Sequence, residues 1–88
     1  MRLDKFIAIA RLLKTRSLVK TATDEGMVFI NGHRAKPAVI VKPGDVIEID
    51  TPRFYKKIKV IDLPPKNMRK TEAVDLYDLL EERTKELF

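Results

Sequence analysis

The sequence predicts an α+β fold in which two short helices pack on a small, mainly antiparallel sheet and an acidic helix ends the chain. Three observations predict it. Apolar residues recur at helical spacing up to residue 24, occur in short runs between turn residues up to residue 61, and return to helical spacing after residue 71. With 88 residues, the chain is long enough for one domain with a modest core.

The first predicted helix is amphipathic. Five apolar residues follow the spacing i, i+3, i+4, i+7 and i+10, namely Leu3, Phe6, Ile7, Ala10 and Leu13. This spacing is typical of a helix of about three turns. Its other face carries Asp4, Lys5 and Arg11, while Arg2 precedes the helix and Lys14 follows it. Because that face is mixed in charge, it indicates only contact with solvent when taken alone.

The second predicted helix is short and basic. It begins at Thr15, whose hydroxyl can cap the first turn, and it ends near Gly26, a residue suited to the turn after a helix. Arg16 and Lys20 lie on the face opposite its apolar residues. A very short connection places Lys14 and Arg16 near the corner between the two helices. Cations gathered at such a corner are well placed to straddle phosphates.

Short apolar runs bounded by turn residues predict the sheet. Asn31-Gly32 is the dipeptide most suited to a type I′ hairpin turn, because both residues need positive φ. We therefore expect a strand at 28–30 and a return strand at 33–36, which Pro37 cuts short. An apolar run, a second turn and two further strands are expected at 39–41, 42–45, 46–50 and 55–61.

The last part of the chain is predicted to be a linker at 64–70 and an acidic helix at 71–88. Thr71 can cap this helix, and Asp75, Asp78 and Glu82 form an acidic stripe along it. Three roles are considered: a solvated helix that closes the core, a shield over part of the basic surface, or a face that contacts another protein.

Charge is divided unevenly along the chain. Residues 1–70 hold 16 basic and 7 acidic side chains, a net charge of +9, whereas residues 71–88 hold 2 basic and 6 acidic ones, a net charge of −4. A basic body is the electrostatic footprint of a protein that binds a polyanion, although many small domains are basic for no specific reason. The acidic tail is not expected to touch a polyanion.

The composition argues against an enzyme, a metal site or a bound cofactor. The chain has no cysteine, so a disulfide or thiolate site is unavailable and a reducing compartment is the simplest setting. The only histidine, His33, follows a hairpin glycine without a ligand cluster, and the glycine spacing matches no phosphate-binding loop. The N-terminus has no apolar run long enough for a signal peptide or a membrane span, so a cytoplasmic protein without membrane contact is expected.

Residues 53–57 combine cations with the aromatic pair Phe54 and Tyr55. Two interpretations of this segment stay open. The aromatic rings can form a basic platform on which single-stranded RNA bases stack, or they can pack in the core of the sheet.

Four segments resemble the RNA-binding module named after the fourth protein of the small ribosomal subunit. They occur in the right order and spacing: Arg2-Leu3-Asp4-Lys5-Phe6, Thr15-Arg16-Ser17-Leu18-Val19, Gly26-Met27-Val28-Phe29-Ile30-Asn31-Gly32 and Lys42-Pro43-Gly44-Asp45-Val46-Ile47. The resemblance implies an L-shaped RNA-binding surface made by the two helices and the hairpin, within a domain at 1–63. It also implies that Asp4 is a structural partner near the second helix. The predicted RNA-binding residues are Arg2, Lys5, Arg11, Lys14, Arg16, Lys20 and Lys36.

The small size and the segment Ala73-Val74-Asp75-Leu76-Tyr77 resemble the stand-alone members of this family that act in bacterial ribosome-associated quality control. No length remains for a catalytic domain, and the chain looks like a whole protein. The resemblance implies a factor that binds a large ribosomal subunit obstructed by peptidyl-tRNA and contacts both its rRNA and the tRNA. It further implies a protein partner of the RqcH/NEMF type, which extends the stalled chain with a C-terminal alanine tail. The factor itself is expected to be a monomer.

Two alternatives stay open. The fifteen-kilodalton ribosome-binding heat-shock members of the family usually carry a longer, strongly basic C-terminal extension, and the acidic tail departs from that pattern. Two helices followed by a hairpin also resemble a winged helix-turn-helix that binds duplex DNA. The second helix, however, offers no Asn, Gln or second Arg for reading the major groove.

Overall fold

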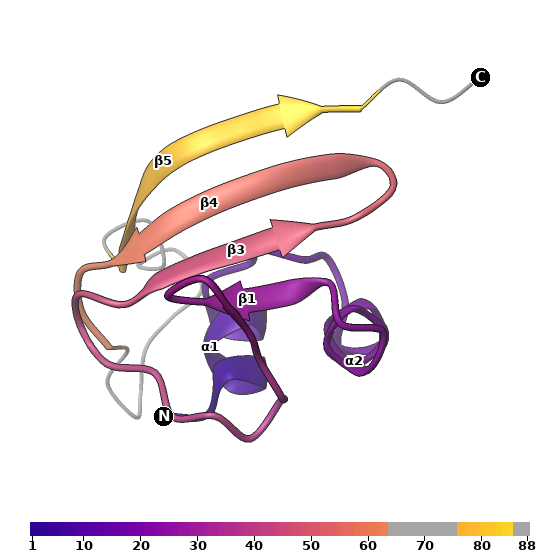
Figure 1. Cartoon of the computed structure of the whole chain (residues 1–88). Coiled ribbons are helices and arrows are strands. Elements are labelled where there is room, and N and C mark those ends of the chain that lie inside the picture. The colour runs from indigo at the N-terminus through magenta and orange to yellow at the C-terminus, as the bar shows by residue number, and fades with distance from the viewer. Residues whose placement is uncertain (64–75, 86–88) are drawn as a thin grey trace.

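The computed structural model of the protein describes residues 1–63 and 76–85, and it confirms the α+β fold class (Figure 1). Two helices, α1 (Leu3–Ile9) and α2 (Arg16–Asp24), lie on one side of an antiparallel sheet. The sheet contains β1 (Val28–Ile30), β2 (His33–Arg34), β3 (Val46–Asp50), β4 (Phe54–Val60) and β5 (Tyr77–Thr84). Its strand order is β2-β1-β3-β4-β5.

The core lies between the helices and the sheet. The largest fully buried side chains come from both layers and from the segment before β3: Phe6, Leu3, Ile7, Ile47, Ile49, Ile58, Val28, Val41 and Val60. Along β3, Ile47 and Ile49 face this core while Glu48 and Asp50 lie on the open face, as the alternation of a strand requires. Burying each large apolar side chain contributes about 1.5–3 kcal/mol, and this burial fixes which face of the sheet the helices cover.

Helix α1 is shorter than its apolar spacing predicted. It ends at Ile9, and Arg11 adopts a left-handed backbone conformation with φ 57°. The N–H of Arg11 donates to Ala8 and the N–H of Leu12 donates to Ile7, which closes the helix with a Schellman-type turn. Leu12 and Leu13 are both buried. Two successive residues of a continuous helix would point about 100° apart, so the turn lets both side chains reach the core.

Helix α2 has the ends that the sequence predicted. The Thr15 hydroxyl accepts a 3.1 Å hydrogen bond from the N–H of Leu18, which caps the first turn. At the other end Gly26 has φ 73°, and the N–H of Met27 donates to Ala22 over 2.8 Å. These contacts define a Schellman turn that directs the chain from the helix straight into β1.

The predicted hairpin is also present. Asn31 and Gly32 both have positive φ, 50° and 83°, and they connect β1 to β2. The Asn31 amide donates to Asp45 and its carbonyl oxygen accepts from the N–H of Val46, at 3.0 and 2.9 Å. These two bonds attach the hairpin turn to the second predicted turn.

The expected run at 39–41 is not a strand of the sheet. It forms only an isolated bridge between Ile40 and Arg2. The Val39 and Pro37 carbonyl groups accept hydrogen bonds from the first two N–H groups of α1, those of Leu3 and Asp4. The segment therefore satisfies donors that a helix N-terminus leaves without intrahelical partners, where no side chain caps the helix.

The predicted acidic helix at 71–88 is wrong for residues 77–84, which form the edge strand β5. The strand pairs with β4, and its acidic residues lie opposite lysines: Glu82 opposite Lys56, Glu81 opposite Lys57, and Asp78 opposite Lys59. Opposite charges across neighbouring strands stabilise the pairing, whereas an isolated helix would leave them in water. The predicted linker at 64–70 and the cap Thr71 lie outside the described residues.

Candidate nucleic-acid interface

Four of the seven predicted site residues line one groove between α1 and α2. This groove, here called the helix groove, has a volume of about 540 Å³. The cations that line it are Arg2, Lys5, Arg16 and Lys20, and all four are exposed. Arg2 and Lys5 come from the start of the chain, while Arg16 and Lys20 lie one turn apart on α2. Their grouping concentrates four positive charges around one groove.

Two carboxylates, those of Asp4 and Asp24, share the helix groove with these cations. The Arg2 guanidinium donates from Nε and Nη2 to the two oxygens of Asp4, each over 3.2 Å, so the fork is oriented by its neighbour. Asp4 also accepts a 2.8 Å bond from the N–H of Lys5. The expected position of Asp4 near the second helix agrees with its place in the groove. Its hydrogen bonds within the described residues, however, run to Arg2 and Lys5 and not to α2.

Arg11 and Lys14 lie on the other side of α2, apart from the helix groove. They line a second hollow of about 880 Å³, here called the corner groove, together with Leu18, Arg53 and Phe54. Both cations are exposed, and within residues 1–63 and 76–85 neither forms an ion pair. The connection between the helices therefore places Arg11 and Lys14 in a different groove from Arg16 and Lys20.

Lys36 is exposed and lines neither groove. It follows β2 and precedes Pro37, a residue that does line the helix groove. Lys36 is therefore next in sequence to a residue of the helix groove, but its own side chain is not among the cations that line it.

The aromatic pair of the predicted basic platform is split between the two faces of the sheet. Phe54 is half-buried against the core and lines the corner groove, with the Lys56 ammonium 5.6 Å from its ring centre. Tyr55 lies on the open face with its cross-strand neighbour Asp50. The two rings therefore do not form one platform, because successive residues of a strand point to opposite faces.

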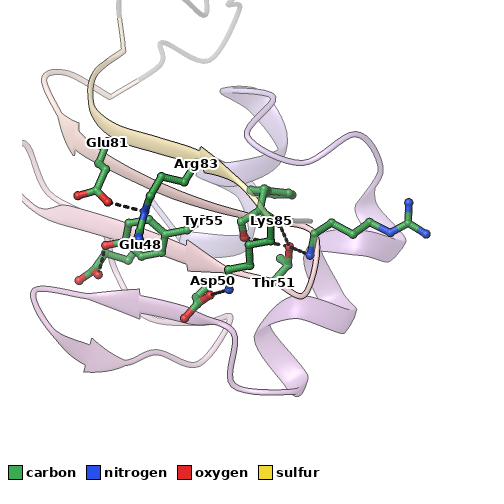
Figure 2. A network of polar contacts seen from close by, with 9 residues as sticks. Glu48, Asp50, Thr51, Tyr55, Glu81, Arg83 and Lys85 are labelled. Carbon is green, nitrogen blue, oxygen red and sulfur yellow. Dashed lines mark hydrogen bonds and ion pairs between the residues drawn. The ribbon is translucent and has the colours of Figure 1, made fainter. Parts of the chain in front are cut away.

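On the open face, Tyr55 belongs to a polar network that joins three strands (Figure 2). Its hydroxyl donates a 2.5 Å hydrogen bond to Glu48 on β3, and the Arg83 guanidinium of β5 lies 4.7 Å from its ring centre. Arg83 in turn pairs with Glu81 over 2.7 Å, and Lys85 pairs with Asp50. Both cations labelled in Figure 2, Arg83 and Lys85, are thus paired with carboxylates.

Sequence reasoning missed that Arg53 and Lys56 join Arg11 and Lys14 around one groove. The signal was the aromatic pair flanked by cations at 53–57, but nothing local connected that segment with the corner between the helices.

The described ranges contain no group of three or more acidic or histidine side chains arranged to hold a metal ion. None of the helices described is long and apolar enough to cross a membrane. His33 begins β2 and is exposed, which agrees with its expected place at a hairpin turn.

Two short helices, a hairpin and a basic groove between the helices define the class of the protein: a small module that presents cations from a folded support. Residues 1–47 match the family model of the S4 domain. The chain is 40% identical over 84 residues to the RQC P-site tRNA stabilizing factor of Bacillus subtilis, a match that covers 93% of this chain and 94% of that protein. The chain therefore belongs to the S4-domain family that contains these factors.

Heat-shock members of the family are similar as well. The chain is 36% identical to the heat shock protein 15 homolog of Haemophilus influenzae, over 97% of this chain and 65% of that protein. The trimeric structure of heat shock protein 15 from Vibrio cholerae has a TM-score of 0.78 and 35% identity, and it covers 90% of this chain and 80% of that one. The likeness in structure therefore extends well beyond the segment that matches the family model.

Proposed function

We propose that this protein is a non-enzymatic RNA-binding factor of ribosome-associated quality control in the cytoplasm. It binds a large ribosomal subunit obstructed by peptidyl-tRNA and contacts both the rRNA and the tRNA. It acts as a monomer on the same particle as an RqcH/NEMF-type protein, and by holding the tRNA it supports the addition of a C-terminal alanine tail to the stalled chain. The helix groove carries this proposal.

The helix groove suits phosphate recognition without base reading. Arg16 and Lys20 project from one helix and form no ion pair within the described residues, whereas the Arg2 fork is paired with Asp4. Each phosphate contact made by such cations releases condensed counterions and adds affinity whatever the RNA sequence. A guanidinium can also donate two parallel hydrogen bonds to one phosphate, which gives Arg16 a role that a lysine would not fill equally.

The relatives support the quality-control assignment. RQC P-site tRNA stabilizing factors from Bacillus subtilis and from Listeria innocua are similar to this chain at 40% identity each, over 94% of each relative. Residues 71–88, with 2 basic and 6 acidic side chains, lack the basic character expected of a heat-shock member. A role in recycling ribosomes under heat shock is therefore the second candidate, favoured by the structural likeness to heat shock protein 15. The S4-domain match argues against a winged helix-turn-helix.

Sedimentation of tagged protein from cells with stalled ribosomes tests the proposal. The wild type should move with large subunits that carry tRNA and an RqcH/NEMF-type protein, and Arg16→Ala should reduce that fraction about tenfold because a charged, forked contact is lost. Lys59→Ala is the matched control, since Lys59 is equally exposed but lies on β4, away from both grooves. Co-sedimentation of Arg16→Ala at the wild-type level would contradict the assignment of the helix groove. Recovery of the wild type without ribosomal RNA would contradict the function.

A further inference from the structure

The corner groove combines an apolar floor with a basic rim. Leu18 is 47% exposed in it, and Phe54 lines the same hollow from β4. Arg11, Lys14 and Arg53 supply the rim. Such a hollow offers an apolar surface to a flat group and positive charge to an anion attached to that group.

The acidic group in the corner groove is already neutralised. Glu82 of β5 lies in the lining, but Lys56 pairs with it over 3.2 Å. The net charge of the lining is therefore set by the three rim cations, Arg11, Lys14 and Arg53. Their charge is complementary to a polyanion and not to a basic segment.

Arg11 holds its position at a conformational cost. Its φ of 57° lies in the left-handed region, at the place after a helix where glycine is usual. A residue with a Cβ is strained in that region. Glycine would close α1 equally well, so the helix turn does not itself require an arginine. The turn places Arg11 in the lining of the corner groove, where its guanidinium adds a positive charge.

The two grooves lie on opposite sides of α2. Arg16, Val19 and Lys20 face the helix groove, whereas Leu18, Thr21 and Ala22 face the corner groove. A strand of RNA that crosses the beginning of α2 would pass from one groove to the other. Beside its cations the helix groove is lined by aliphatic residues such as Ala8, Ile9 and Val19, whereas the corner groove offers the aromatic ring of Phe54 together with Leu18 to a base.

We propose that the corner groove binds an unpaired stretch of the same RNA whose duplex part lies in the helix groove. Bases of the unpaired nucleotides rest on Leu18 and Phe54, and their phosphates contact Arg11, Lys14 and Arg53. Unpaired bases are free to leave the stack and bind apolar side chains, whereas those of a duplex are not. The inference rests on the proposed function and divides its predicted cations into a duplex-binding group and a single-strand-binding group.

Two RNAs test the division by fluorescence anisotropy. One is a blunt-ended hairpin, and the other is the same hairpin with a 3′ overhang of six adenosines. The wild type should bind the overhang hairpin about tenfold more tightly, which is the gain from accommodating one base on an apolar surface. The measured quantity is the ratio of the two Kd values, because a general change in charge alters both alike.

Two substitutions reduce the gain while preserving the fold. Arg11→Gly deletes a rim cation and relieves the left-handed backbone, and Leu18→Glu places a carboxylate on the floor of the groove. In the second variant Thr15 and Glu at position 18 have the spacing of a capping box, so α2 should be as stable as before. Ser17→Glu is the matched control, because it adds the same charge one residue away and outside both grooves.

The ratio should fall to about one in Leu18→Glu, fall part of the way in Arg11→Gly, which keeps the apolar floor, and stay near tenfold in Ser17→Glu. Equal wild-type affinity for the two RNAs, with the blunt hairpin still bound, would overturn this inference alone. Failure of the wild type to bind either RNA would contradict the proposed function as well. Binding of poly-L-glutamate that Arg11→Gly abolishes, without any gain from the overhang, would assign the groove to an acidic protein segment and overturn the proposal.

Discussion

The Tyr55 hydroxyl on β4 donates a 2.5 Å hydrogen bond to the Glu48 carboxylate on β3. This bond to a negatively charged acceptor is the main reason that the pKa of Tyr55 rises from 10.0 to about 12, with burial and the charges of Glu48 and Glu81 adding to it. Arg83, which lies over the ring, acts in the opposite direction. Tyr55 therefore links its own strand, β4, to β3 on one side and to β5 on the other (Figure 2).

The raised pKa predicts a loss of stability in alkali. Folding favours the protonated phenol, so its contribution is complete below the unfolded pKa of about 10 and is lost as the pH rises from there through about 12. Tyr55→Phe should lower the free energy of unfolding by about 1 kcal/mol at pH 8. The difference between wild type and variant should shrink between pH 10 and 12, as measured by urea denaturation.

An absorbance titration of the phenolate provides the direct check. It should be made in a Tyr77→Phe background, because Tyr55 and Tyr77 are the two tyrosines of the chain. Ionisation of Tyr55 with a midpoint near 10 would show that the bond to Glu48 is absent in solution.

The local signals in the sequence predicted the parts of the fold that local contacts determine. Thr15 is followed by the helix it caps, and Asn31-Gly32 forms the turn that its two residues favour. The end of α1 could not be predicted in the same way, since Arg11 occupies a place where a glycine would have been the signal. The turn depends on burying Leu12 and Leu13 together, which is a property of the completed core.

The structure of the acidic tail could not be predicted from local signals either, because it depends on contacts between residues far apart in the chain. Leu76, Tyr77 and Leu80 recur at a spacing that suits a helix, but the pairing of Glu82 with Lys56 involves residues far apart in the chain. The cations of α1 and α2 were predictable from helical periodicity. Their division between two grooves depends on how the corner sits against β4, which no spacing in the sequence encodes.

Pairing of Lys56 with Glu82 should be measurable as a coupling between β4 and β5. The atoms lie 3.2 Å apart, and the Lys56 side chain is 20% exposed while that of Glu82 is 51% exposed. A double-mutant cycle with Lys56→Met and Glu82→Gln should give a coupling energy of about 0.5 kcal/mol in low salt, because the pair is partly open to water. Urea denaturation provides the four free energies. A coupling of zero that persists at low salt would show that this ion pair does not stabilise the pairing of β5 with β4.

Gly26 should tolerate a side chain less well than Gly44. Both have positive φ, 73° and 94°, so alanine at either place should cost about 1 kcal/mol of backbone strain. A Cβ at Gly26 would also lie 2.9 Å from the Arg34 side chain, whereas one at Gly44 would meet nothing within 4 Å. Arg34 lies over the Phe29 ring at 5.7 Å, and displacing it should add about 0.5–1 kcal/mol.

Thermal or urea denaturation of Gly26→Ala, Gly44→Ala and the double variant Gly26→Ala with Arg34→Ala separates the two effects. In an Arg34→Ala background, Gly26→Ala should cost only as much free energy of unfolding as Gly44→Ala does in the wild type. The reference for the double variant is Arg34→Ala alone. If Gly26→Ala and Gly44→Ala destabilise the protein equally, the contact between Gly26 and Arg34 carries no energy.

Salt dependence should distinguish Arg16 from Lys20 within the helix groove. The logarithm of the binding constant for the blunt hairpin falls linearly with the logarithm of salt concentration, with a slope set by the number of phosphates contacted. Lys20→Ala should reduce the magnitude of that slope by about 1, because one phosphate contact is lost. Arg16→Lys should keep the slope but weaken binding at every salt concentration, since the charge remains and the guanidinium fork does not. Lys59→Ala should change neither quantity, and an equal loss of slope in this control would show that the helix groove holds no particular phosphate.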